Sequence, residues 1–297
     1  VYDMCIEMGI KPKVVDMRQP LPKVSKVVTN IGKYKLRPEQ GRAVKSVINN
    51  RVGDTPFHIG VLDYTVNAGK TLIMSSLYLS YKKQLKTLLI TNDSDWLNQA
   101  REEFKQYLPG EDITFVQGKV LNWSNFTIGM VQSISRNMRF YQKELSQIDM
   151  VLVDEADQGG SKQYQNVITR LFNTRIRIGL SGTIYMSKLA KDKVKNMNLE
   201  CFFGKVIAEF KLKDSIKKGY STKTVVKMVP GKPWYGNWES DCISYKEIYD
   251  DSITNCYTAW LMAYNRLLWN LNQGRYPALV VCKHIAHCEN LYKFFKK

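Results

Sequence analysis

The sequence lacks the segments that mark membrane and secreted proteins. It contains neither a signal peptide nor an apolar run of transmembrane length. Its six cysteines are scattered, and no two of them form a C-x-x-C pair. These absences argue against a membrane protein and indicate a reducing intracellular compartment.

Acidic residues are few relative to basic ones. The chain has 27 Asp and Glu against 44 Lys and Arg, which gives a formal net charge of +17. Such an excess attracts polyanions before any specific contact forms, so a nucleic acid is the expected partner. A basic surface that only aids solubility is the alternative, because most lysine runs are solvated helix faces.

Short apolar or β-branched runs alternate with longer helix-patterned stretches from about Phe57 onward. The runs include FHIGVL, TLLIT, MVLVDEAD and IRIGLSGT, and the helix-patterned stretches include KTLIMSSLYLSYKKQ and DWLNQAREEFKQYL. Nearly continuous apolar strands suit a parallel sheet that helices cover on both faces. The predicted fold class is therefore α/β.

Four segments follow from composition shifts along the chain. Residues 1–30 are short and basic, and we expect a linker or the remnant of an upstream domain. Residues 31–228 form the main α/β domain. Residues 229–241, VPGKPWYGNWESD, combine proline, glycine and tryptophan without periodicity and predict a linker. Residues 242–297 begin a second α/β unit with a long helix, the strand PALVVCK and another helix.

The stretch YTVNAGKT lies between the run FHIGVL and a helical pattern. Its end, Gly69-Lys70-Thr71, matches the end of a phosphate-binding loop, although Tyr64 stands where the first glycine is expected. Such a loop needs backbone N–H groups aimed at phosphate, a lysine for the β and γ oxygens and a hydroxyl for Mg²⁺. Asn67 tolerates a left-handed backbone, so the missing glycine does not exclude the site. The candidate ATP-binding residues here are Asn67, Ala68, Gly69, Lys70 and Thr71.

A pair of carboxylates follows the apolar run MVLV. Asp154 and Glu155 are expected at the carboxyl end of this strand, where open α/β sheets bind ligands. An acid at this position holds Mg²⁺, and its neighbour orients and deprotonates the attacking water. The predicted catalytic residues are therefore Lys70, Asp154 and Glu155, with Thr71 and Asp154 as the Mg²⁺ ligands.

A cluster of soft side chains near the end of the chain suggests zinc at first sight. Cys282, His284, His287 and Cys288 lie within seven residues. Their spacing matches no paired-ligand pattern, and a strand running into a helix would point them in different directions. No structural zinc is expected.

The stretch VDEAD resembles the Walker B box, or DEAD box, of superfamily 2 DExD/H helicases, and further stretches resemble that family's motifs in the same order. LRPEQ resembles an upstream element whose glutamine recognises adenine, which implies nucleotide contacts for Arg37 and Gln40. GLSGT resembles the motif that links the nucleotide site to a second domain, which implies a coupling role for Ser181, Gly182 and Thr183. LLITNDSDW, FVQGK and FTIGMVQSI resemble regions that meet the nucleic-acid backbone, which makes candidates of Thr91, Gly118, Lys119, Gln132 and Ser133.

The segment FFGKVIAEFKLKDSIKKGYSTK is similar to one in the subgroup that contains the phage helicase UvsW and the repair helicase XPB. The resemblance covers roughly Tyr34 to the end and implies a RecA-like P-loop NTPase domain in residues 31–228 and an incomplete second RecA-like domain in residues 242–297. It also implies a phage or bacterial source, and hence the cytoplasm of a bacterial or phage-infected cell, with the nucleus as the eukaryotic alternative.

The resemblance implies an ATP-dependent helicase or translocase that uses ATP and Mg²⁺ to remodel or unwind DNA, which could be branched, with RNA as a second candidate. The motifs that would supply arginines to the ATP site from the second domain are not in these residues. Because such arginines contribute about 10³-fold or more to turnover, we expect slow hydrolysis by this chain alone. The alternatives are the motor subunit of a restriction or defence system and a non-catalytic nucleic-acid-binding module. Other protein partners are not predicted.

Overall fold

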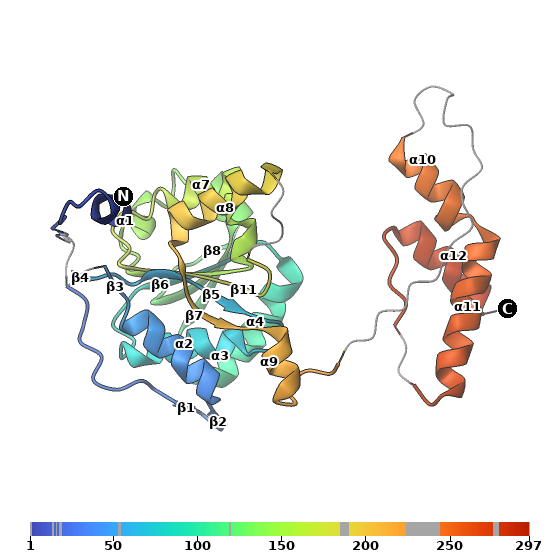
Figure 1. Ribbon diagram of the computed structural model, residues 1–297, viewed down its shortest axis with the longest axis horizontal. Coiled ribbons are helices and arrows are strands. Elements are labelled where there is room, and N and C mark those ends of the chain that lie inside the picture. Colours follow the sequence, from blue (N-terminus) through green and yellow to red (C-terminus); the bar gives the residue numbers. More distant parts are fainter. Residues whose placement is uncertain are drawn as a thin grey trace. The chain divides into compact units, whose positions relative to one another are not determined.

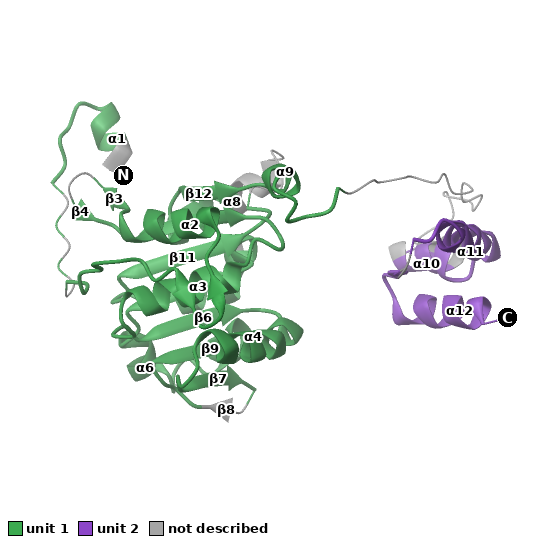
Figure 2. Ribbon diagram, turned by 90° about the horizontal axis from the view of Figure 1, so that it is seen from below, with its two compact units in different colours: residues 1–223 green, residues 224–297 purple. Residues whose placement is uncertain are grey.

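The computed structural model describes residues 2–13, 15, 17, 20–52, 55–118, 120–184, 190–223, 244–275 and 279–296. The chain forms two compact units, residues 1–223 and residues 224–297 (Figure 2). The predicted linker, residues 229–241, lies outside the described residues. The predicted domain boundaries at residues 30 and 228 stay predictions.

An eight-stranded sheet forms the centre of the first unit, in the order β12-β5-β11-β10-β6-β9-β7-β8. Seven strands of this sheet run parallel. The eighth, β8, lies at one edge and pairs antiparallel with β7. The α/β fold predicted from the alternation is confirmed. The strands are β5 (Ile59–Tyr64), β6 (Thr87–Thr91), β7 (Ile113–Gln117), β8 (Val120–Leu121), β9 (Phe126–Met130), β10 (Met150–Asp154), β11 (Ile176–Ser181) and β12 (Val206–Phe210).

Helices cover both faces of this sheet, as Figure 1 shows. On β10, the buried side chain of Leu152 packs in the cluster that contains α2, α3 and α4. Val151 and Val153 pack in the opposite cluster, with α5, α6, α7 and α8. Both faces of the strand are buried, which explains its continuous apolar sequence. The helices are α2 (Pro38–Ile48), α3 (Lys70–Ser80), α4 (Ser94–Tyr107), α5 (Val131–Arg136), α6 (Gln142–Ser146), α7 (Lys162–Ile168) and α8 (Ala190–Phe203).

Shorter elements complete the first unit. The stretch before the hairpin of β1 and β2 is bound to α3, because the Val28 amide donates to Ser80 Oγ at 3.0 Å and Ser76 Oγ donates to the Val28 carbonyl at 2.6 Å. The elements are α1 (Tyr2–Glu7), β1 (Asn30–Ile31), β2 (Tyr34–Lys35), β3 (Arg51–Val52), β4 (Thr55–Pro56), the 3-10 helix η1 (Ala156–Gly160) and α9 (Leu212–Lys217).

The described part of the second unit is helical. It contains α10 (Tyr245–Tyr249), the π-helical turn η2 (Asp250–Thr254), α11 (Tyr257–Asn272) and α12 (Ile285–Phe295). The strand predicted in PALVVCK is wrong for the described residues 279–282, which are not assigned to a strand. A strand needs a neighbour for its backbone hydrogen bonds, and no other strand occurs among the described residues of this unit.

No helix in the described part of the chain is long and apolar enough to cross a membrane.

Candidate active site

The predicted phosphate loop joins β5 to α3. Asn67 has φ 62° and Gly69 has φ 74°, so both take the left-handed conformation, and the backbone conformation predicted for Asn67 is confirmed. A Cβ on Gly69 would also displace the end of the Gln40 side chain, because it would lie 2.4 Å from Gln40 Nε2. Lys70 and Thr71 form the first turn of α3, where backbone N–H groups are free to meet an anion.

Tyr64, which stands where the first glycine of the loop is expected, belongs to the end of β5. Its side chain is buried and its hydroxyl donates to the Glu39 carbonyl at 2.8 Å. Burial raises the pKa of this hydroxyl to about 12. The tyrosine therefore anchors β5 to α2 and leaves the shape of the loop to Asn67 and Gly69.

Lys70 is held between the two predicted catalytic carboxylates. Its Nζ lies 2.9 Å from Glu155 Oε1 and 3.2 Å from Asp154 Oδ1. Burial alone would lower the pKa of Lys70, but the Asp154 and Glu155 carboxylates outweigh it and raise that pKa. Burial also raises the pKa of Asp154 even though Lys70 opposes the shift. The charges of the phosphate loop and of the end of β10 are therefore coupled through Lys70.

A divalent cation fits this arrangement. Asp154 Oδ1 is buried and has no hydrogen-bond partner, since its contact with Lys70 is an ion pair without hydrogen-bond geometry. Thr71 follows Lys70 directly and carries a hydroxyl oxygen. Carboxylate and hydroxyl oxygens are hard ligands suited to Mg²⁺.

Arg37 and Gln40, predicted to contact the nucleotide, both reach the loop. Gln40 Oε1 accepts from the Arg37 amide at 2.8 Å, and its Nε2 donates to the Ala68 carbonyl at 2.8 Å. Arg37 Nη2 donates to the Asn67 carbonyl at 3.0 Å. The Gln40 amide is therefore engaged by backbone on both sides, and its predicted contact with adenine stays a prediction.

The predicted coupling motif lies beside both halves of the site. Ser181 Oγ donates to Asp157 Oδ1 at 2.7 Å and accepts from the Thr183 amide at 3.2 Å. A Cβ on Gly182 would lie 3.1 Å from the Cα of Thr65, so this glycine packs against the start of the phosphate loop. The motif contacts the segment after Glu155 and the loop together.

The predicted nucleic-acid residues gather at the carboxyl ends of β6, β7 and β9, which are neighbouring strands. The Gly118 amide donates to Ser133 Oγ at 2.9 Å, and Gln132 Nε2 donates to the carbonyl of Asn92, the residue after Thr91, at 3.2 Å. Thr91 is buried, and Lys119 lies outside the described residues. The described candidates form one rim, and their contacts with nucleic acid stay predictions.

The sequence alone did not reveal that α4 forms a wall of the site. A cavity of about 380 Å³ opens over the phosphate loop and is bounded also by Asp154 and Glu155. Its remaining wall consists of four side chains of α4, namely Trp96, Gln99, Glu103 and Tyr107. Their spacing of three, four and four residues puts them on one helix face, which is the signal that could have identified them.

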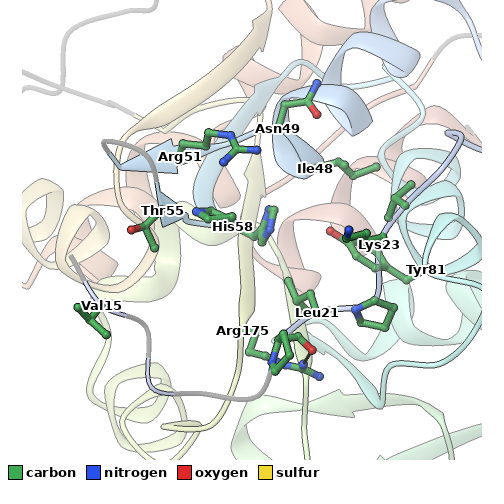
Figure 3. Close-up of a pocket in the computed structure, with 14 residues that line it drawn as sticks. Val15, Leu21, Lys23, Ile48, Asn49, Arg51, Thr55, His58, Tyr81 and Arg175 are labelled. Carbon is green, nitrogen blue, oxygen red and sulfur yellow. Dashed lines mark hydrogen bonds between the residues drawn. The ribbon is translucent and has the colours of Figure 1, made fainter. Parts of the chain in front are cut away.

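A larger cavity, of about 850 Å³, lies at the amino ends of β5 and β11, away from the carboxyl ends that carry the loop (Figure 3). Its polar side chains contact the protein's own structure. His58 Nδ1 lies 2.8 Å from the Val47 carbonyl, and Arg175 donates to the Pro20 carbonyl at 2.6 Å.

In the described parts of both units, no group of three or more His, Cys, Asp or Glu is placed to hold a metal ion.

Residues 33–186 match the model of the family described as type III restriction enzyme, res subunit. This match spans more than half of the 297 residues. The chain belongs to this family. The matched range contains the phosphate loop, the carboxylates and the coupling motif, and it ends before α8, β12 and α9. No curated protein matches the sequence.

Two solved structures share the fold. The crystal structure of the UvsW helicase from bacteriophage T4 is 20% identical with a TM-score of 0.53, and the match covers 69% of this chain and 75% of that one. A second crystal structure of T4 UvsW has the same identity and TM-score, and the match covers 99% of this chain and 59% of that one. The chain thus spans 59% of that longer relative. The RecA-like fold implied by the helicase resemblance is confirmed.

Proposed function

We propose that the chain is the motor domain of a superfamily 2 ATPase that binds Mg²⁺ and ATP and uses hydrolysis to move on or remodel DNA. One observation carries this proposal: Lys70, at the first turn of α3, lies within 3.2 Å of both Asp154 and Glu155. A lysine and two acids converge there at the carboxyl ends of the parallel strands β5 and β10, which lie on either side of β11. Membership in the restriction-subunit family and the likeness to UvsW support the proposal.

Binding of a metal–triphosphate suits this cluster electrostatically. Lys70 now has two carboxylate partners, which phosphate oxygens would replace. The carboxylates would then need a cation of their own, and Mg²⁺ held by Thr71 and Asp154 would meet that need. When bound, the metal would neutralise charge on the phosphates. Each buried charge therefore keeps a partner before and after binding.

Glu155 is suited to positioning the attacking water. Its side chain is 43% exposed, so it reaches the cavity, whereas the Asp154 side chain is 3% exposed. General-base assistance contributes about 10²-fold to 10⁴-fold in rate. In the proposed site, Arg37 and Gln40 meet the base, and Ser181, Gly182 and Thr183 transmit the change around Asp157.

DNA is the proposed polyanion, and RNA is the alternative. The net charge of +17 favours either. The rim formed by Thr91, Gly118, Gln132 and Ser133 lies at the same edge of the sheet as the ATP site, so a bound strand would lie near the nucleotide. Affinity for DNA should weaken steeply with added salt because counterions are released on binding.

A motor subunit of a restriction system is the second candidate, and membership in the family of type III restriction enzyme res subunits favours it. DNA cleavage that requires ATP and the remaining subunits of such a system would distinguish this role from a helicase that leaves both strands intact. A non-catalytic DNA-binding module is distinguished from both by the absence of ATP hydrolysis.

The test is Mg²⁺–ATP binding by calorimetry, together with single-turnover hydrolysis in the presence of single-stranded, duplex and forked DNA. Lys70→Ala should weaken ATP binding by about tenfold or more, because a charge-assisted contact is lost. Lys105→Ala, which removes an exposed lysine paired with Glu102, is the charge-matched control. Absence of ATP binding by the unaltered chain would refute the proposal, and fast DNA-stimulated turnover would refute the expectation of slow hydrolysis.

A further inference from the structure

The sequence Lys-Gly-Tyr after α9 forms a defined helix end. Gly219 has φ 73°, its amide donates to the Ile216 carbonyl at 3.0 Å, and the Tyr220 amide donates to the Ser215 carbonyl at 2.9 Å. These two hydrogen bonds form a Schellman motif, which requires a left-handed residue and turns the next side chain back along the helix. The glycine therefore fixes where Tyr220 points.

Tyr220 points at the nucleotide side of the fold. The guanidinium of Arg37 lies 4.4 Å from the centre of the Tyr220 ring, in cation–π contact. The same Arg37 donates from Nη2 to the Asn67 carbonyl in the phosphate loop at 3.0 Å. A continuous contact thus runs from the turn after α9, through Arg37, to the loop.

Charge pairs fix both ends of α9 to the segments that flank the loop. Lys218 Nζ lies 2.8 Å from Glu39 Oε2, and the Glu39 side chain is fully buried. At the other end of the helix, Lys211 pairs with Asp63, the penultimate residue of β5. These contacts within the first unit place Tyr220 beside Arg37.

We propose that Tyr220 is a positioning residue for the nucleotide base: its ring holds the Arg37 guanidinium flat, so that the opposite face of the guanidinium stacks on a purine. Guanidinium planes stack well on aromatic rings, and a ring behind the plane removes its rotational freedom. The inference rests on the proposed ATPase function, in which Arg37 meets the base. Tyr220 lies outside the matched residues 33–186.

The experiment separates the base from the phosphates. Binding of Mg²⁺–ATP and of Mg²⁺–tripolyphosphate, which has no base, is measured for the full chain and for Tyr220→Leu, Tyr220→Phe and Lys70→Ala. Tyr220→Leu should raise the Kd for ATP by about fivefold to thirtyfold, the range of a partly desolvated cation–π contact, and leave the Kd for tripolyphosphate unchanged. Tyr220→Phe should restore ATP binding, because it keeps the ring.

Tyr292→Leu is the matched control, because Tyr292 on α12 is an exposed ring whose centre lies 4.8 Å from Lys296 Nζ. Thermal unfolding of each variant monitors the fold. Unchanged ATP affinity in Tyr220→Leu, or equal weakening for ATP and tripolyphosphate, would overturn the inference and leave the ATPase proposal standing. If Trp96→Leu weakened ATP binding and Tyr220→Leu did not, the base would be placed against α4, and the inference would also be overturned. Failure of the unaltered chain to bind either ligand would refute the ATPase proposal, and the inference with it.

Discussion

At the scale of single residues, Glu155 combines a strained backbone with an exposed carboxylate. Its φ of 52° is left-handed, which costs a non-glycine residue about 1 kcal/mol. Strain of this kind persists where the surroundings fix it, and here the buried Asp154 precedes it and η1 follows. The conformation turns the carboxylate toward Lys70 and the cavity.

Glu155→Gln keeps the size and backbone of this residue and removes its negative charge. We expect single-turnover ATP hydrolysis to fall by about 10²-fold or more, because the base for the attacking water is lost. ATP binding should persist, since Asp154 and Lys70 remain. Quenched-flow measurement of product and calorimetry check the two statements, and equal loss of binding and hydrolysis would contradict the role.

We expect Asp154 to make the proposed metal-dependent binding of ATP sensitive to acid. Burial raises its pKa above the ordinary 3.8, so a larger fraction of this carboxyl is protonated at a given pH than for a free aspartate. Protonation removes the proposed Mg²⁺ ligand. As the pH is lowered, affinity for ATP in the presence of Mg²⁺ should therefore already decline at pH values above 3.8. Affinity measured with a chelator in place of Mg²⁺ should decline less. Parallel profiles with and without Mg²⁺ would contradict this assignment.

At the scale of elements, α9 lies next to the site although its residues are far from the loop in sequence. One of the two ion pairs at its ends joins Lys218 to the buried Glu39. Burial alone would raise the pKa of Glu39, but the hydrogen bond from Lys218, a backbone hydrogen bond and the charges of Lys218 and Arg37 together outweigh it and lower that pKa. The ionised form is thus favoured in the folded protein.

Lys218→Ala should lower the free energy of unfolding by about 1–3 kcal/mol, because it removes the hydrogen-bonded cation of a buried carboxylate and leaves it the more distant Arg37, whose Nε lies 3.6 Å from Glu39 Oε1. A depressed pKa contributes stability above the unfolded value of 4.5, and that contribution is lost as pH falls through the folded value. The difference between variant and parent should therefore shrink in acid. Urea unfolding across pH measures it, with Lys217→Ala as the neighbouring control, and a pH-independent difference would contradict the pairing.

The sequence predicted the elements that carry local signals and missed contacts between distant segments. The apolar run before Asp154, the asparagine turn at Asn67 and the helix start at Lys70 follow from periodicity and residue type, and the structure contains all three. The strand expected in residues 277–283 is not found in the described residues 279–283, because an apolar run does not reveal whether a neighbouring strand exists. The contact of Tyr220 with Arg37 joins residues far apart in the chain, and local patterns carry no information on it.

At the scale of the molecule, the described parts of the candidate site belong to the first unit. The loop, the carboxylates, α4 and α9 all lie within residues 1–223. A domain with its own core on both faces of a sheet is expected to fold alone. This gives the domain division a direct test.

A shortened chain of residues 1–223 should unfold cooperatively and bind Mg²⁺–ATP with a Kd within about threefold of that of the full chain, a difference well under 1 kcal/mol. Circular dichroism melting and calorimetry measure both properties. A Kd more than about tenfold weaker would instead assign part of the binding energy to residues 224–297.

The double ion pair of Lys70 also bears on which anions the protein would tolerate in a cell. Free phosphate would offer Lys70 one new partner but would leave Asp154 and Glu155 without a counterion, so its net gain is small. A magnesium-bound triphosphate would bring the anion and the cation together. The internal pairing would thus disfavour binding of free phosphate, the product of the proposed hydrolysis, and we expect free phosphate to be a weak inhibitor.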